Sequence, residues 1–127
     1  MRAYLDSSAG AKLFLKETES LAMRQFAKRS EVELISTILL ETELRRIAAR
    51  SGVSQAVVSE VLTGITVYPV LDGDFRAAGT LPGNVRTLDA LHLQGVLSTQ
   101  SDVLVTYDNR MSSVAETLLG LVVLQPA

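Results

Sequence analysis

The sequence contains no cysteine and only one histidine. Without cysteine the protein cannot form a disulfide scaffold, a thiolate zinc site or a cysteine nucleophile, and this composition suits a reducing compartment such as the cytoplasm. The single histidine, His92, has no second histidine or cysteine with which to complete a zinc site. Proline is scarce as well, with three residues, and no stretch rich in proline and glycine marks a linker.

Long apolar runs are also missing. No segment approaches the roughly 20 residues of a membrane-spanning helix, and the N-terminus lacks the basic region and long apolar stretch of a signal peptide. We therefore expect a cytoplasmic protein with no membrane partner. A surplus of basic charge is absent too, since the formal net charge is -2. This argues against binding of nucleic acid through a general basic field, but it leaves room for a local basic patch.

What is present is the composition of an ordinary globular domain. The 127 residues are 47% hydrophobic and 20% charged, which suffices for one sizeable core and is too little for two. We expect a single domain over residues 1–127. Arginine supplies most of the basic charge, and Arg45, Arg46 and Arg50 cluster in one segment. Such a cluster suits phosphate groups, although it is also common on a solvated helix face.

Short apolar runs alternate with amphipathic segments along the chain. Strands are expected at Ala3–Leu5, Leu34–Ser36, Val67–Val70, Val103–Thr106 and Val122–Leu124. Helices are expected at Ser8–Glu17, Glu19–Arg29, Leu39–Ser51, Ser54–Leu62, Phe75–Ala78, Leu88–Ser98 and Arg110–Leu118. This alternation predicts a three-layer α/β domain with a mainly parallel sheet of about five strands flanked by helices. Ligands bind such sheets outside the carboxyl ends of the strands, where the strand order reverses.

Two aspartates occupy equivalent places a hundred residues apart. Asp6 and Asp108 each follow closely on a predicted strand and precede a predicted helix. A carboxylate there caps free backbone N–H groups of the helix, which explains each residue taken singly. Both places also lie at the carboxyl end of the predicted sheet, so the two side chains could meet there.

A third acid, Asp89, lies in the segment "VRTLDALHLQG". At 3.6 residues per turn it shares the apolar face of the predicted helix with His92 and Val96, although it is also a first-turn carboxylate with Thr87 as the cap. A carboxylate that faces the interior requires an arginine, a metal ion or a second acid that shares its proton. His92, one turn further on, is interpreted as a packing or hydrogen-bonded core residue.

The fourth acid comes from "LISTILLETELRRIAARSG", which offers two glutamates. Glu43 lies at the margin of the apolar stripe of this predicted helix, whereas Glu41 points away from it. Glu41 also has Arg45 four residues on, which is the favourable order for a surface ion pair. We interpret Glu41 as solvated and Glu43 as the site residue, with a pair to Arg46 as the alternative role of Glu43.

The four acids are more informative together than singly. Two lie at strand ends and two on helices near the apolar faces, so their oxygens would converge at the point where the strand order reverses. Converging carboxylates repel one another, and without a cation at least one should have a raised pKa. Magnesium or manganese prefers such ligands. The usual chemistry at such a site is hydrolysis of phosphodiester bonds.

Five segments of the sequence resemble a known family in order and spacing: "YLDSSAGAKLF", "ISTILLETELRR", "RTLDALHL", "LVTYDNRM" and "LGLVVLQP". Together they resemble the VapC toxins, which are PIN-domain endoribonucleases of bacterial toxin–antitoxin pairs. The resemblance covers essentially the whole chain. It implies a PIN-like fold, an RNA substrate, Mg²⁺ with Mn²⁺ as a substitute, a VapB-like antitoxin and a homodimer.

The resemblance also assigns roles to residues. The acidic metal and catalytic site of the family falls on Asp6, Glu43, Asp89 and Asp108. Ser8 matches a small hydroxyl residue that positions a water, and Arg110 matches a basic position that touches phosphate or caps a helix. Gly10 departs from the family, which usually has a larger apolar residue there.

Two other classes of protein remain as alternatives. One is a PIN fold kept only as a binding module for RNA or protein, without turnover. The other is a phosphatase or phosphoacceptor domain that uses the aspartate after its first strand. Phosphatases similar to the haloacid dehalogenases repeat the acid two residues on, and here that place is Ser8. The intact set of four acids favours the nuclease over both.

Overall fold

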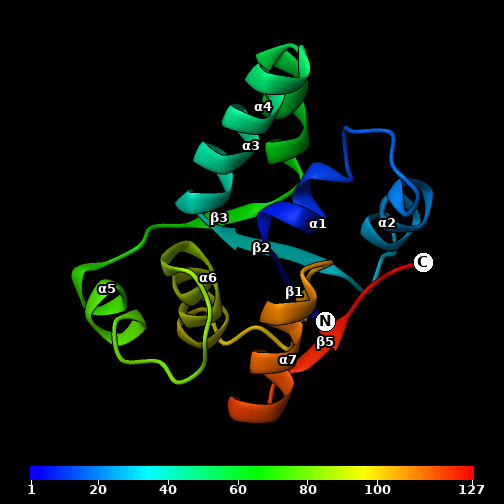
Figure 1. Ribbon diagram of the computed structural model, residues 1–127. Helices are drawn as coiled ribbons and strands as arrows, with labels where there is room; N and C mark the ends of the chain where they lie inside the picture. Colours follow the sequence, from blue (N-terminus) through cyan, green and yellow to red (C-terminus); the bar gives the residue numbers. More distant parts are fainter.

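Five short strands form a single parallel sheet in the computed structural model, which describes residues 1–127 (Figure 1). The strands are β1 Arg2–Leu5, β2 Glu33–Thr37, β3 Thr66–Tyr68, β4 Val103–Val105 and β5 Val122–Leu124. Their order across the sheet is β3-β2-β1-β4-β5, and every neighbouring pair is parallel. The predicted parallel sheet of five strands is therefore confirmed.

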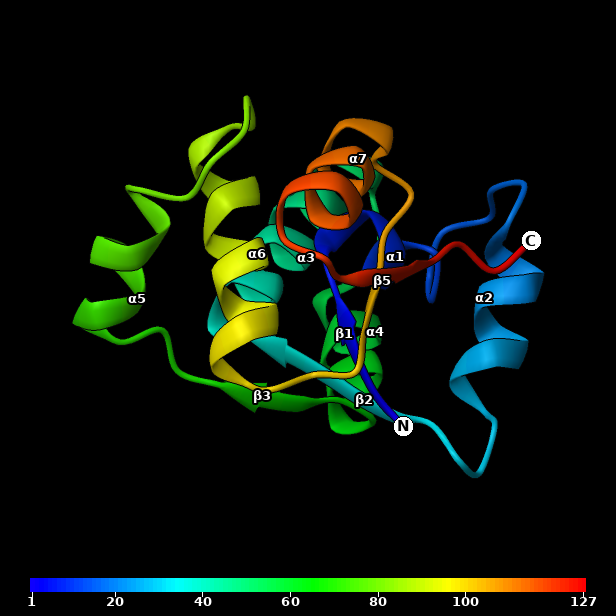
Figure 2. The same cartoon turned by 90° about the horizontal axis from the view of Figure 1, so that it is seen from below.

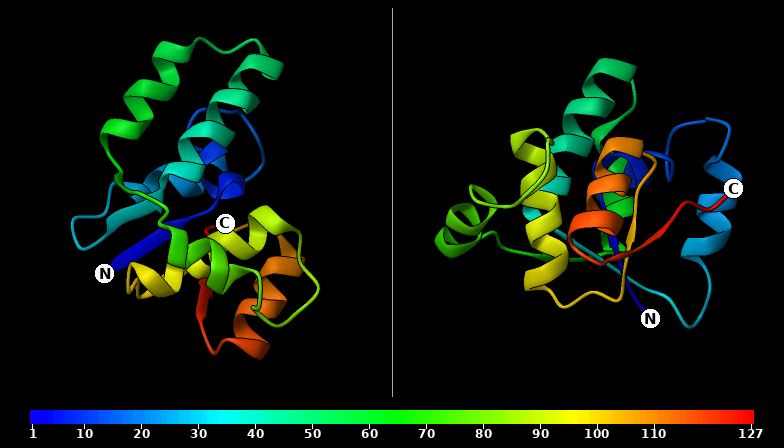
Figure 3. Two further views of the ribbon diagram at one scale, coloured as in Figure 1. Left: turned by 90° about the vertical axis from the view of Figure 1, so that its left-hand side faces the viewer. Right: turned by 60° about the horizontal axis from the view of Figure 1, so that its bottom comes forward.

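Helices cover both faces of this sheet, as the turned views show (Figures 2 and 3). Helices α1 to α4 lie over one face, whereas α6 and α7 lie over the other and α5 packs against α6. The helices are α1 Ser7–Ala11, α2 Ser20–Ala27, α3 Ile38–Ser51, α4 Gln55–Thr63, α5 Asp72–Ala78, α6 Thr87–Ser98 and α7 Asn109–Leu118. None of them combines the length and the apolar composition needed to cross a bilayer.

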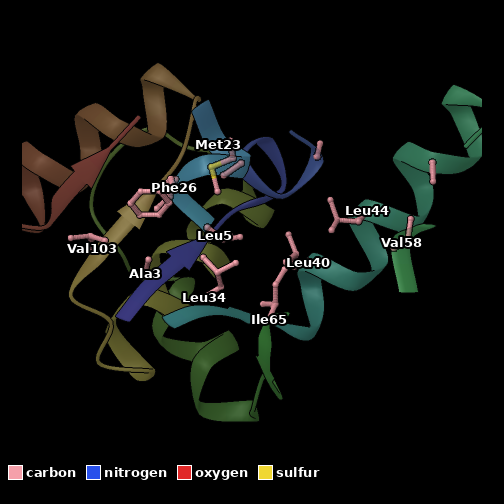
Figure 4. Close-up of a cluster of buried hydrophobic side chains, with 14 residues drawn as sticks. Ala3, Leu5, Met23, Phe26, Leu34, Leu40, Leu44, Val58, Ile65 and Val103 are labelled. Atoms are coloured by element: carbon pink, nitrogen blue, oxygen red, sulfur yellow. The ribbon is translucent and has the colours of Figure 1, made fainter. Parts of the chain in front are cut away.

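The side chains of the central strands alternate between two hydrophobic cores. Ala3 and Leu5 of β1 belong to the core beneath α1 to α4, where Met23 and Phe26 of α2 also lie (Figure 4). Tyr4, between them in sequence, belongs to the core beneath α6 and α7. Because successive side chains of a strand point to opposite faces, a run that is apolar throughout is buried on both sides. This confirms the predicted three-layer architecture.

The first helix is much shorter than the predicted Ser8–Glu17. It ends at Ala11, and the N–H groups of Lys12, Leu13 and Phe14 each donate to the carbonyl three residues back, as in a tighter helical turn. Three consecutive apolar residues, Leu13, Phe14 and Leu15, pack against the core in this segment. A regular helix presents consecutive residues to different sides, so it could not bury all three. The prediction was wrong because this packing outweighs helical periodicity.

Smaller differences concern the ends of other elements. Strand β3 ends at Tyr68, before Pro69, because proline has no N–H to donate to a neighbouring strand. Helix α6 starts at Thr87, so Arg86 rather than Thr87 occupies the capping position. The predicted helix Phe75–Ala78 begins earlier, at Asp72.

Candidate active site

The strand order reverses between β1 and β4, which lie side by side in the middle of the sheet. Leu5 at the end of β1 pairs with Val105 at the end of β4, so the residues that follow them face each other. The Thr106 hydroxyl donates a hydrogen bond of 2.6 Å to Oδ2 of Asp6. It also accepts one of 3.0 Å from the backbone N–H of Asp108. The two aspartates therefore meet at the predicted place.

Asp6 is held by a dense set of hydrogen bonds. Its Oδ1 accepts 3.0 Å from the N–H of Ala9 and 2.7 Å from the Ser8 hydroxyl. The Asp6 residue is only 2% exposed, and burial raises the pKa of its carboxyl, while the hydrogen bonds from Thr106, Ala9 and Ser8 oppose that rise. The raised pKa agrees with the sequence expectation, but its main cause is burial rather than repulsion by the other acids.

Asp108 caps helix α7 and also faces the site. Its Oδ1 accepts 2.9 Å from the N–H of Met111, and its Oδ2 lies 3.6 Å from Nη2 of Arg86. Asp6 likewise caps α1 through Ala9. Helix capping and a place in the site therefore do not exclude each other, since a carboxylate has two oxygens.

Asp89 finds an arginine as its partner. Nε of Arg86 lies 3.2 Å from Oδ2 of Asp89, whose side chain is 13% exposed against 76% for that of Arg86. Arg86 thus bridges two of the four acids, Asp89 and Asp108. Arg86 and Asp89 are three residues apart, the spacing that suggested an ion pair between Glu43 and Arg46. The same rule could therefore have identified Arg86 from the sequence.

Glu43 lies on α3 and makes no pair with Arg46. Its Oε1 is 2.5 Å from Nε2 of His92, which is a buried, hydrogen-bonded core residue as predicted. Glu41 pairs with Arg45 at 2.9 Å and does not line the pocket that Glu43 lines. The assignment of the two glutamates to different faces of this helix is therefore correct.

All four acids line one open pocket of about 610 Å³. Ser8, Lys12 and Arg86 line the same pocket, whereas Arg110 lines a smaller hollow beside it, together with Arg86 and two of the acids. No group of three or more acidic or histidine side chains stands close enough together to hold a metal ion as positioned. The acids surround the pocket more loosely than the sequence predicted, and Arg86 pairs with two of them.

The sequence of the protein is similar to those of known proteins along nearly its whole length. Residues 3–117 match the family model described as PIN domain. The chain belongs to the PIN domain family. Among curated PIN relatives, it is 36% identical to Ribonuclease VapC46 of Mycobacterium tuberculosis over 98% of this chain and 97% of that protein. It is also 36% identical to Ribonuclease VapC35 of the same species, over 97% of this chain and 96% of that protein.

Solved structures show the same PIN fold at low sequence identity. VapC20 of Mycobacterium tuberculosis, described as a toxin that cleaves the sarcin-ricin loop, aligns with a TM-score of 0.75 at 15% identity, covering 98% of this chain and 99% of that one. A chain of VapBC2 from Rickettsia felis, bound to a DNA fragment from its promoter, gives a TM-score of 0.75 at 13% identity and covers all of both chains. These matches confirm the PIN-like α/β fold.

Sequence reasoning about this PIN domain missed two residues besides Arg86. Thr106 joins Asp6 to Asp108 through its single hydroxyl, and Lys12 lines the pocket while pairing with Glu19 at 2.9 Å. Thr106 could have been noticed as the hydroxyl residue that ends the predicted strand, two residues before Asp108. Lys12 follows Ser8 by four residues, the spacing that puts two side chains on one helix face, and this could have placed it beside Ser8.

Proposed function

We propose that this protein is a metal-dependent endoribonuclease of the VapC-like toxin class, in which Asp6, Glu43, Asp89 and Asp108 form the catalytic and metal-binding site. One observation supports this most strongly. Four carboxylates from four separate parts of the chain line a single pocket where the strand order reverses. The relatives named as ribonucleases support the reaction type.

The donor set of the pocket fits Mg²⁺, with Mn²⁺ as a substitute. Four carboxylates and the Ser8 hydroxyl offer only oxygen, which hard divalent ions prefer. Magnesium keeps several of its waters and binds through one or two carboxylates, so a pocket of about 610 Å³ with well-separated acids suits a hydrated ion. When bound, the ion would activate water and neutralise charge on the phosphate.

The chain itself supplies positioning and charge. The Ser8 hydroxyl accepts 2.9 Å from the N–H of Tyr107 and donates to Asp6, which leaves one lone pair to position a water. Arg86 and Arg110 are exposed beside the acids, where their guanidinium groups can bind an RNA phosphate. For Arg86 this means exchanging its acidic partners for the phosphate. We propose that residues 1–127 act as one PIN-like domain.

The test is cleavage of RNA by the purified protein with Mg²⁺, with Mn²⁺ and with a chelator. Cleavage with either ion and none with chelator is the expected result, because the carboxylates act through the cation. Sequencing of the new RNA ends would identify the cleavage site. A protein that binds RNA without cleaving it under any of these conditions would instead be a binding module.

Partners and location follow from the same class. We propose a VapB-like antitoxin, a homodimer and a cytoplasmic site of action. The structural likeness to the VapBC2 chain described above supports the antitoxin. The absence of cysteine suits the cytoplasm.

RNA binding should depend on arginines next to the pocket. Arg46 and Arg50 are exposed on α3, each one turn beyond a residue that lines the pocket. Replacing both by glutamine should weaken RNA binding and flatten its dependence on salt, by roughly 0.7 in the logarithmic slope for each phosphate that the protein no longer neutralises. Binding titrations at several salt concentrations measure this.

Arg45 is not part of this prediction, because its guanidinium is already held by Glu41, Gln55 and Ser59. It joins α3 to α4, so its loss would affect folding. An unchanged salt slope in the variant lacking Arg46 and Arg50 would assign those arginines to the solvated surface or to the antitoxin contact.

A further inference from the structure

A chain of buried hydrogen bonds lies directly behind Glu43. His92 contacts Oε1 of Glu43 through Nε2 at 2.5 Å and contacts the Tyr4 hydroxyl through Nδ1 at 2.8 Å. The Tyr4 hydroxyl also lies 3.2 Å from the Thr37 hydroxyl. His92 is 1% exposed, and Tyr4 and Thr37 are buried as well. This series of hydrogen bonds connects β1, the end of β2 and α6 to Glu43.

Glu43 and Tyr4, on either side of His92, determine which atom donates in each hydrogen bond of the histidine ring. Nε2 of His92 faces a carboxylate oxygen, so it must carry a hydrogen, because two acceptors at that distance would repel. Burial raises the pKa of Tyr4, which keeps its hydroxyl protonated. A protonated Tyr4 can donate to Nδ1 of His92, which favours the tautomer with its hydrogen on Nε2. His92 therefore donates to Glu43.

Glu43 depends on this donor more than Asp6 and Asp108 depend on any one of theirs. Asp6 and Asp108 are each held by a backbone N–H of the helix that they cap. Asp89 is held by Arg86. Glu43 has a longer side chain that is 21% exposed, and its single hydrogen bond is the one from His92. Without His92, nothing in the structure would hold this carboxylate toward the pocket.

The helix that carries His92 is shaped to allow the contact. Gly95 lies one turn after His92, and a Cβ at this position would stand 2.5 Å from the Tyr4 hydroxyl oxygen and 2.8 Å from its ring. Glycine inside a helix lowers the stability of that helix relative to alanine. Its presence here lets α6 approach β1 closely enough for Tyr4 to reach His92.

We propose that His92, oriented by Tyr4, is a positioning residue that holds one oxygen of Glu43 so that the other faces the pocket and its divalent cation. This inference rests on the proposed function, since it assigns Glu43 a cation to bind. It assigns to His92 a role outside direct contact with RNA. Groups that orient a ligand in this way typically contribute about 10-fold to 100-fold to metal affinity or activity.

The test compares His92→Leu with His92→Gln in calorimetric titrations with MnCl₂ and in RNA cleavage at increasing Mn²⁺. His92→Leu removes the donor and should weaken Mn²⁺ binding by about 10-fold to 100-fold. Cleavage by this variant should recover toward the wild-type kcat at saturating Mn²⁺, with an unchanged KM for RNA. The glutamine amide can donate to Glu43 from nearly the same place, so His92→Gln should restore most of the affinity.

Two further variants keep the test decisive if His92→Leu fails to fold. Tyr4→Phe removes the hydroxyl, and Gly95→Ala displaces it, so both should weaken Mn²⁺ binding by a smaller factor. Thr42→Ala, exposed on α3 beside Glu43, is the matched control and should bind as the wild type does. Wild-type affinity in folded His92→Leu, or in both Tyr4→Phe and Gly95→Ala, would overturn the inference, as would equal losses in His92→Leu and His92→Gln. A wild type that neither binds Mn²⁺ nor cleaves RNA would instead overturn the proposed function.

Discussion

Changing any one of Asp6, Glu43, Asp89 or Asp108 to its amide is expected to reduce RNA cleavage by more than about a hundredfold. The loss of a group that merely orients a metal ligand costs about 10-fold to 100-fold, so the loss of a ligand itself should cost more. Because we propose that the four acids act together on bound metal, double variants should be little worse than single ones. Initial rates of cleavage of a labelled RNA at saturating Mg²⁺ measure the effect.

Glu41→Gln is the matched control on the same helix. It makes the same chemical change two residues from Glu43, but Glu41 pairs with Arg45 and lies outside the pocket. The expected cost is that of an ion pair four residues apart on a helix, about 0.3 to 0.5 kcal/mol of stability, with cleavage nearly unchanged. If Glu41→Gln were as damaging as Glu43→Gln, the assignment of the two glutamates would be wrong.

The melting temperature of the wild type should rise when Mg²⁺ replaces a chelator. An ion that binds only the folded state stabilises it by about 2.7 kcal/mol at one hundred times its dissociation constant. For a domain of this size that stabilisation corresponds to a shift of several degrees. Asp89→Asn should show a much smaller shift, since one carboxylate of the pocket is gone. Thermal unfolding of both proteins, each with chelator and with Mg²⁺, measures the difference.

The melting temperatures measured with chelator distinguish a cation site from a set of helix caps and ion pairs. Asp89→Asn removes one partner of Arg86, whose side chain is 76% exposed, so that pair contributes little stability. Arg86 also keeps Asp108 as a partner, so the variant should melt within a few degrees of the wild type. A wild type indifferent to Mg²⁺, together with a clearly destabilised Asp89→Asn, would mean that Asp89 serves only the helix.

The local pattern of the sequence determined the architecture and two of the site positions. Runs of apolar residues without alternation marked the strands of a sheet that is covered on both faces. Asp6 and Asp108 stand at ends of neighbouring parallel strands, and such ends meet at one edge of the sheet whatever the loops do. Helical periodicity separated Glu43 from Glu41, because the direction of a side chain on a helix depends only on its position in the turn.

The tertiary structure alone decided which long-range contacts hold these acids. The early end of α1, the bridge from Arg86 to Asp108 and the hydrogen bond from His92 to Glu43 all depend on contacts between distant parts of the chain. His92 and Glu43 are 49 residues apart, and no periodicity relates them. Burial of Asp6, the main cause of its raised pKa, likewise arises only when β1, α1 and β4 pack together. The sequence determined which helix or strand end carries each acid, whereas the tertiary structure determined the distances between the acids and their exposure to water.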